Sequence, residues 1–145
     1  CLSPLLLLLI PLFRRRTAFI TTEDFIESAI AAGIVPQMNV RRFKWVVTEA
    51  VYERYLDRTV GRVRFEELLV GEAYSRTDVD DFIEKSGADQ QTAIYLTMAE
   101  RVGRLATEDA ALAEAAEALG IAVVTRERFL REYAVHRKSA AVDRE

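Results

Sequence analysis

The chain has 145 residues, of which 50% are hydrophobic and 30% are charged, and its formal net charge is −3. This length fits one domain with a substantial core, and the composition excludes a disordered chain. A single cysteine, Cys1, and a single histidine, His136, exclude an internal disulfide and a zinc site built from these residue types. The net negative charge argues against electrostatic binding of nucleic acid over the whole surface. A bound metal would need oxygen ligands, so Mg²⁺ or Mn²⁺ is the expected ion.

Residues 1–16 combine an apolar run, Leu5–Phe13, with the three arginines Arg14–Arg16. The run is shorter than the roughly 20 residues that cross a bilayer, and its basic residues follow it, unlike those of a signal peptide. We therefore predict a leader of undefined role at 1–16, a folded domain at 17–135 and a polar tail at 136–145. No membrane partner is assigned, and the expected location is the cytoplasm.

Strands and helices are expected to alternate through the first half of the chain. Thr22, Thr48 and Asp78 stand where helix-capping residues belong, and Gly33 ends the first helix. Apolar, β-branched runs such as Trp45–Val47 predict strands. Strands are predicted at 17–20, 45–47 and 72–76, and helices at 22–33, 48–57, 64–69 and 78–85.

The second half contains a predicted strand, helix and strand in direct succession. Leu105–Thr107 ends a buried strand, and the helix 108–119 carries Leu112, Ala115, Ala116 and Leu119 on one apolar face before Gly120 ends it. Ile121–Val124 follows as a second buried strand. This pattern predicts an α/β fold: a single small three-layer domain with a mostly parallel central sheet of about four or five strands and helices on both faces. Asp109 then lies at the carboxyl end of a strand, where ligands collect in such sheets.

The segment SGADQQTAIYLTMAERVGRLATEDAALAEAAEALGIAVVT resembles the C-terminal half of PIN domains, a metal-dependent ribonuclease fold. Asp89 matches the aspartate that opens the family's long helix, and Asp109 matches the aspartate of its Thr-x-Asp-type motif, with Thr107 as the threonine. The resemblance is strongest over residues 45–133. It implies an endoribonuclease of the toxin–antitoxin kind, in which Asp89 and Asp109 hold Mg²⁺ or Mn²⁺ and are catalytic. The implied partners are RNA and an antitoxin protein or a second copy of the chain.

Two positions depart from the PIN pattern. Thr21 stands where the family has its first aspartate, and a hydroxyl does not supply a carboxylate's charge to a divalent ion. Arg54 stands where the family has a glutamate, and the adjacent Glu53 is the candidate third catalytic and metal-binding acid, although neighbouring helix positions differ by about 100°. Glu23 and Asp24 are expected to point away from the site. A degenerate relative with impaired catalysis, or a non-catalytic module that binds RNA or protein, is therefore the alternative.

Other interpretations compete with a catalytic site. Asp89 and Asp109 also stand where carboxylates cap helices, and Arg41–Arg42 could contact phosphates or simply be solvated. The stretch LAEAAEALGIAVVTRERFL also follows a helix-turn-helix pattern, with Thr125 opening the recognition helix. Against this DNA-binding reading, Ile121–Val124 is an apolar run where a tight turn favours polar residues. The placement of that run in a sheet or in a turn decides between the two.

Overall fold

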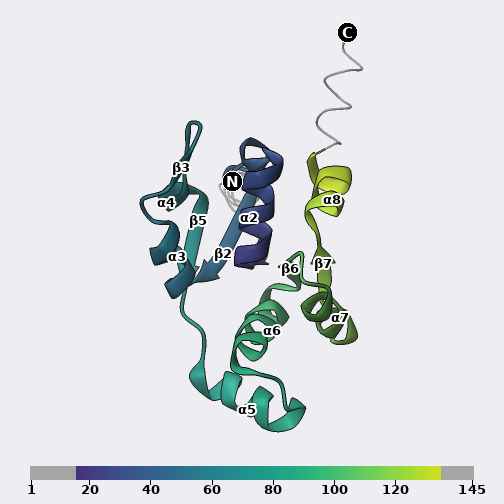
Figure 1. The fold of residues 1–145 in the computed structure, drawn as a ribbon. Helices are drawn as coiled ribbons and strands as arrows, with labels where there is room; N and C mark the ends of the chain where they lie inside the picture. Colours follow the sequence, from purple (N-terminus) through teal and green to yellow (C-terminus); the bar gives the residue numbers. More distant parts are fainter. Residues whose placement is uncertain (1–15, 135–145) are drawn as a thin grey trace, which may run out of the picture.

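A computed structural model describes residues 16–134 (Figure 1); residues 1–15 and the tail with His136 lie outside the described part. The strands are β1 (Thr17–Thr21), β2 (Phe43–Thr48), β3 (Thr59–Val60), β4 (Val63–Arg64), β5 (Leu69–Glu72), β6 (Arg104–Ala106) and β7 (Ala122–Val124). The helices are α2 (Glu23–Ala32), η1 (Val35–Gln37), α3 (Glu49–Tyr55), α4 (Phe65–Leu68), α5 (Arg76–Ser86), α6 (Gln90–Val102), α7 (Ala110–Ala118), α8 (Arg126–Phe129) and η2 (Leu130–Ala134).

The central sheet has five parallel strands in the order β5-β2-β1-β6-β7, and β3 and β4 form a separate antiparallel hairpin. The predicted α/β class with a mostly parallel sheet is confirmed. From β1 the chain builds outward through β2 and β5 on one side, then returns to add β6 and β7 on the other. The strand order therefore reverses between β1 and β6, and such a switch point is where open parallel sheets bind ligands.

Successive residues along each strand supply opposite faces of the sheet. Phe19 belongs to a core cluster with α2, α3 and α8, whereas its neighbour Ile20 belongs to a second cluster with α6 and α7. The same alternation separates Leu105 from Ala106, as the two-residue period of a strand requires. Helices thus cover both faces, and α5 packs against α6 (Figure 1). These two helix layers bring the starts of α2, α6 and α7 to one edge of the sheet.

An aromatic cluster fixes α2 and α8 on their face of the sheet. The fully buried Trp45 stacks on Phe19 with ring centroids 4.8 Å apart and on Phe25 of α2 at 5.5 Å. Phe129 of α8 meets the Trp45 ring edge-on at 5.2 Å. Aromatic side chains of this size bury large apolar areas, so the cluster holds the two helices rigidly against β1 and β2.

Three elements of the first half have other boundaries than predicted. The third strand is β5 at 69–72 rather than 72–76, because pairing with β2 ends where Thr48 meets Glu72 and residues beyond have no partner strand. Helix α5 starts at Arg76 with Ser75 as its cap, since Ser75 Oγ accepts the backbone N–H of Asp78. Helix α3 ends at Tyr55 rather than at residue 57.

The predicted strand–helix–strand unit over 105–124 is present as β6, α7 and β7, although the helix covers 110–118 rather than 108–119 and the strands end at Ala106 and begin at Ala122. Leu105 pairs with Val123 in parallel register, and Thr107 N donates to Val124 O at 3.1 Å. This pairing excludes the helix-turn-helix arrangement, which needs a tight turn at the same place. Leu119, predicted on the buried face of the helix, is 45% exposed because α7 ends at Ala118 and its last turn leaves the core.

Candidate functional site

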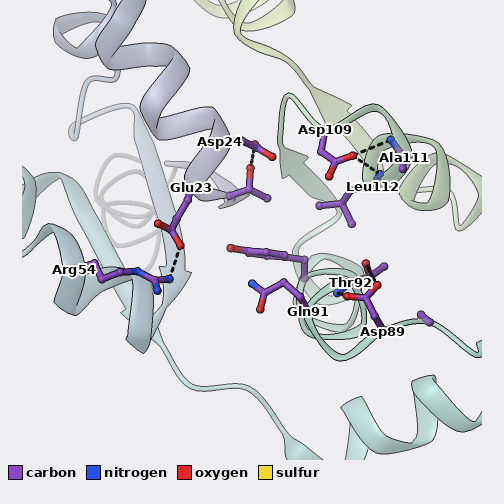
Figure 2. A pocket seen from close by; sticks show the side chains of 12 residues that line it. Glu23, Asp24, Arg54, Asp89, Gln91, Thr92, Asp109, Ala111 and Leu112 are labelled. Carbon is purple, nitrogen blue, oxygen red and sulfur yellow. Dashed lines mark hydrogen bonds and ion pairs between the residues drawn. The ribbon is translucent and has the colours of Figure 1, made fainter.

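A cleft opens at the carboxyl edge of the sheet, beside the switch point between β1 and β6 (Figure 2). Its volume is about 820 Å³. The first turns of α2, α6 and α7 supply most of its wall, and α3 adds one arginine. The lining residues are Thr22, Glu23, Asp24, Arg54, Ala88, Asp89, Gln91, Thr92, Tyr95, Asp109, Ala111 and Leu112. The cleft therefore lies where a doubly wound sheet binds its ligands, and it is rich in carboxylates.

Asp24 joins the start of α2 to the loop that follows β6. Its Oδ1 accepts the hydroxyl of Thr107 and the backbone N–H of Glu108, both at 3.1 Å, and it also accepts the Thr22 hydroxyl. Thr22 caps α2 and continues the sheet, because its N–H donates to Ala106 O at 3.1 Å. The expectation that Asp24 and Glu23 point away from the site is wrong, since both line the cleft.

Thr107 and Asp109 form the wall on the β6 side. Thr107 is fully buried, and its hydroxyl oxygen accepts the Asp109 N–H at 3.1 Å while donating to Asp24. Asp109 caps α7, because Oδ1 accepts the N–H groups of Ala111 at 2.9 Å and Leu112 at 3.2 Å. One Asp109 oxygen is thus used by its own helix, as Figure 2 shows.

Asp89 caps α6 from the other side of the cleft. Its Oδ1 accepts the Thr92 hydroxyl at 2.6 Å and its Oδ2 accepts the Thr92 backbone N–H at 3.3 Å. These hydrogen bonds to Thr92 lower the pKa of Asp89, because they stabilise the ionised carboxylate. Both oxygens of this carboxylate therefore already have a protein donor.

Arg54 brings the opposite charge into the cleft. Its guanidinium forms an ion pair with Glu23 from the first turn of α2, and Figure 2 shows the two side chains pointing toward each other. The side chains are 57% and 39% exposed, so solvent screens the pair and its stabilising contribution is small. Tyr95 also lines the cleft, and burial raises its pKa, so it stays a neutral hydroxyl.

The predicted site residues are only partly brought together. Asp89 and Asp109 line the same cleft, with Thr107 directly behind Asp109. Glu53 is exposed on α3 and is not among the lining residues; its neighbour Arg54 takes the place that faces the cleft. Thr21 is fully buried outside the lining, and its hydroxyl donates to Phe19 O at 3.1 Å. A one-residue step on a helix rotates a side chain by about 100°, which is why Arg54 faces the cleft and Glu53 does not.

The carboxylates of the cleft are the candidate ligands for a divalent cation. Across residues 16–134, no three acidic, histidine or cysteine side chains are grouped so that they could hold a metal ion. A hard cation such as Mg²⁺ needs several oxygen ligands at short distance, and the cleft acids are instead spread over three helix starts and bonded to protein donors. The cleft thus gathers four carboxylates, from Glu23, Asp24, Asp89 and Asp109, without a grouped set of three among the described residues.

Comparison of the chain with family models, curated proteins and solved structures found no significant match. Within the described part of the chain, no helix has the length and apolar character needed to cross a membrane.

Proposed function

We propose that this chain is a PIN-like domain whose metal-dependent cleavage of RNA is impaired. The doubly wound parallel sheet supports the proposal, as does an acidic cleft beside its switch point to which Asp89 and Asp109 both contribute. The two departures from the PIN pattern, at Thr21 and Arg54, support the impairment. Neither position supplies a carboxylate to the cleft.

The ion pair between Arg54 and Glu23 is the observation that carries the proposal. A guanidinium does not deprotonate at neutral pH, so Arg54 keeps a positive charge inside the cleft. That charge makes the cleft less negative and competes with a divalent cation for the Glu23 carboxylate. Cleavage of a phosphodiester by metal-bound water needs a firmly held ion, and this cleft supports one poorly.

The remaining carboxylates are engaged in structural hydrogen bonds. Asp24 joins the start of α2 to the loop after β6, Asp89 caps α6 and Asp109 caps α7. Binding a metal through these oxygens would weaken a helix cap or the bond between α2 and the loop after β6, each of which contributes about 1 kcal/mol. The loss of these hydrogen bonds lowers the affinity of the cleft for a metal ion.

A non-catalytic role is favoured by the charge of the cleft. Glu23, Asp24, Asp89 and Asp109 outnumber Arg54, so the cleft repels RNA phosphates and attracts a cationic group. A basic segment of a partner protein fits this field better than RNA does.

The experiment that tests the proposal removes the arginine. We expect Mn²⁺ to leave the melting temperature of the unmodified protein nearly unchanged. It should raise that of Arg54→Glu, since a ligand at a hundred times its Kd stabilises by about 2.7 kcal/mol. Arg58→Glu is the matched control, because Arg58 pairs with Glu27 outside the cleft and the charge change is the same.

RNA cleavage gives the second measurement. The unmodified chain should cut single-stranded RNA weakly or not at all in Mn²⁺, and Arg54→Glu should cut faster. Strong metal-dependent cutting by the unmodified chain that Asp109→Asn abolishes would overturn the proposed impairment and establish an intact nuclease. An equal metal response of Arg54→Glu and Arg58→Glu would show that Arg54 is not the cause.

A further inference from the structure

Four arginines gather at the amino edge of the sheet, at the opposite end of the strands from the cleft. Arg16 precedes β1, and its Nη1 donates to Val40 O at 3.2 Å. Arg42 directly precedes β2, and Arg41 lies between it and Val40. Arg62, in the turn of the β3–β4 hairpin, lines the same shallow groove as Val40. We call Arg16, Arg41, Arg42 and Arg62 the arginine face.

The arginine face is not neutralised by nearby acids. Among residues 16–134, none of its four members takes part in an ion pair, whereas the neighbouring Arg64 is paired with Glu66 and Glu67. Three members are exposed, and the guanidinium of the fourth, Arg42, lies 5.0 Å from the centre of the Phe43 ring. The face is therefore a local excess of positive charge on a chain whose net charge is −3.

The β3–β4 hairpin presents part of this charge on a projecting turn. Gly61 and Arg62 form the turn between the paired residues Val60 and Val63. Figure 1 shows the hairpin extending past the neighbouring elements at one end of the molecule. Val40, in the groove beside it, is 43% exposed. Arg62 thus ends a narrow projection that can enter a cleft, with an apolar side chain at its base.

The cleft at the opposite edge of the sheet has the complementary charge. It is lined by Glu23, Asp24, Asp89 and Asp109, against the single arginine Arg54. A carboxylate offers about four acceptor positions, so the helix caps and the pair between Glu23 and Arg54 leave room for further cationic donors. Its volume of about 820 Å³ is that of a pocket for a sizeable ligand, so it can admit the side chains of a hairpin turn.

A second copy of the chain is the partner that matches the arginine face. The face and the cleft lie at opposite ends of the strands, so they cannot meet within one molecule. Single-stranded RNA is a poorer match, because its bases stack on exposed aromatic rings. The large apolar side chains exposed in the described part of the chain are Val40, Leu56 and Leu119, and none of them is aromatic. The net charge of −3 also repels a polyanion at long range.

We propose that copies of this chain associate head to tail, with the arginine face of one copy against the acidic cleft of the next. The guanidinium groups donate to the cleft carboxylates, and the contact covers Val40. Because the two surfaces differ, each added copy leaves one free face and one free cleft, and the assembly grows into a ring or an open chain. This inference rests on the proposed non-catalytic use of the cleft, for which it names the partner, and not on the impaired cleavage.

Sedimentation equilibrium of the full chain tests the proposal. One chain has a mass of 16.4 kDa. At low ionic strength the weight-average mass should rise with concentration beyond that of two chains. It should return to that of one chain as ionic strength approaches about 1 M, where the Debye length is about 3 Å. A mass that stays at one chain in low salt, or that reaches a plateau at two, would overturn the head-to-tail assembly.

Two complementary variants locate the contact. Arg41→Glu with Arg62→Glu removes the face and keeps the cleft, whereas Glu23→Lys with Asp109→Asn does the reverse and retains a helix cap. Each should weaken association at least roughly tenfold, because attraction across the contact is lost or becomes repulsion. A mixture of the two should form a complex of two chains and grow no further, since each supplies one intact surface. A mixture as monomeric as its components would overturn the proposal.

The matched control for the face variant is Arg76→Glu with Lys85→Glu. Both residues are exposed on α5, which Figure 1 shows at the end of the molecule far from the β3–β4 hairpin, and the charge change is identical. The control should associate nearly as the unmodified chain does. A loss of association equal to that of Arg41→Glu with Arg62→Glu would overturn the proposal. Circular dichroism of each variant confirms that the fold is retained.

A fluorescent single-stranded RNA of mixed sequence is tested in parallel. Its binding to a monomeric unmodified chain, with loss of binding in Arg41→Glu with Arg62→Glu, would assign the face to nucleic acid and overturn the assembly. The response of Arg54→Glu to Mn²⁺ is measured separately, as described above. Absence of association beside that response would therefore remove the assembly and leave the impaired cleavage standing, and the converse result would do the opposite.

Discussion

The backbone N–H of Glu108 donates a hydrogen bond of 3.1 Å to Oδ1 of Asp24, which lies 84 positions earlier in the chain. The bond crosses the switch point of the sheet, from the loop after β6 to the first turn of α2. The same carboxylate accepts the buried Thr107 hydroxyl. Asp24 therefore connects the two halves of the sheet, and its hydrogen bonds fix the start of α2 against the loop after β6.

Asp24→Ala should lower the free energy of unfolding by about 1 kcal/mol, since it removes charge-assisted hydrogen bonds and a favourable charge at a helix start. The effect is modest because the side chain of Asp24 is exposed. Urea denaturation measures it. Asp80→Ala, an exposed aspartate on α5, is the control and should change stability by less than about 0.5 kcal/mol. Equal losses of unfolding free energy in Asp24→Ala and Asp80→Ala would contradict this structural role of Asp24.

Thr107→Val should cost about 1–2 kcal/mol, because the fully buried hydroxyl both donates to Asp24 and accepts the Asp109 N–H. Combined with Asp24→Ala, the loss should be smaller than the sum by about 0.5–1 kcal/mol, as expected for residues in contact. Urea denaturation of both single variants and the double variant gives this coupling. Strict additivity would mean that the two side chains do not act together.

Thr21→Asp should destabilise the protein by roughly 2–4 kcal/mol, because the side chain at this position is fully buried and its hydroxyl bonds to Phe19 O. Thr21→Val, which keeps the shape and adds no charge, is the control and should cost less. Thermal unfolding with and without Mn²⁺ measures both. A stable Thr21→Asp variant whose melting temperature rises in Mn²⁺ would show that a carboxylate at residue 21 reaches the cleft.

Thr92→Val should raise the pKa of Asp89 toward its ordinary value, since it removes the hydroxyl whose hydrogen bond is the largest cause of the lowered pKa. A lowered folded-state pKa contributes stability above the unfolded pKa, and this contribution is lost as the pH falls through the folded pKa. The acid-side loss of stability linked to Asp89 should therefore be smaller in the variant.

NMR titration of the Asp89 carboxyl carbon measures the pKa shift. Thr125→Val, which removes the cap of α8, is the control and should leave the Asp89 titration in place. No change in Thr92→Val would show that the backbone N–H of Thr92 alone holds the carboxylate ionised.

The sequence by itself determined the class of fold and most of its helices and strands. Thr22 and Thr48 cap the helices predicted to follow them, and Gly33 and Gly120 follow helix ends with positive φ, at 72° and 79°. These features are local, because a cap or a glycine turn involves residues only a few positions apart. The β-branched run at 121–124 likewise formed a strand because its side chains suit a sheet buried on both faces.

Only the tertiary structure decided which polar residues meet. The contact between Asp24 and Thr107 depends on β1 and β6 being neighbours in the sheet, which no local pattern specifies. The choice of Arg54 over Glu53 depends on the rotation of α3, because one position on a helix turns the side chain by about 100°. Burial of Thr21 depends in the same way on packing from both faces. Local propensity sets the elements, whereas the composition of the cleft follows from strand order and helix rotation, which long-range packing fixes.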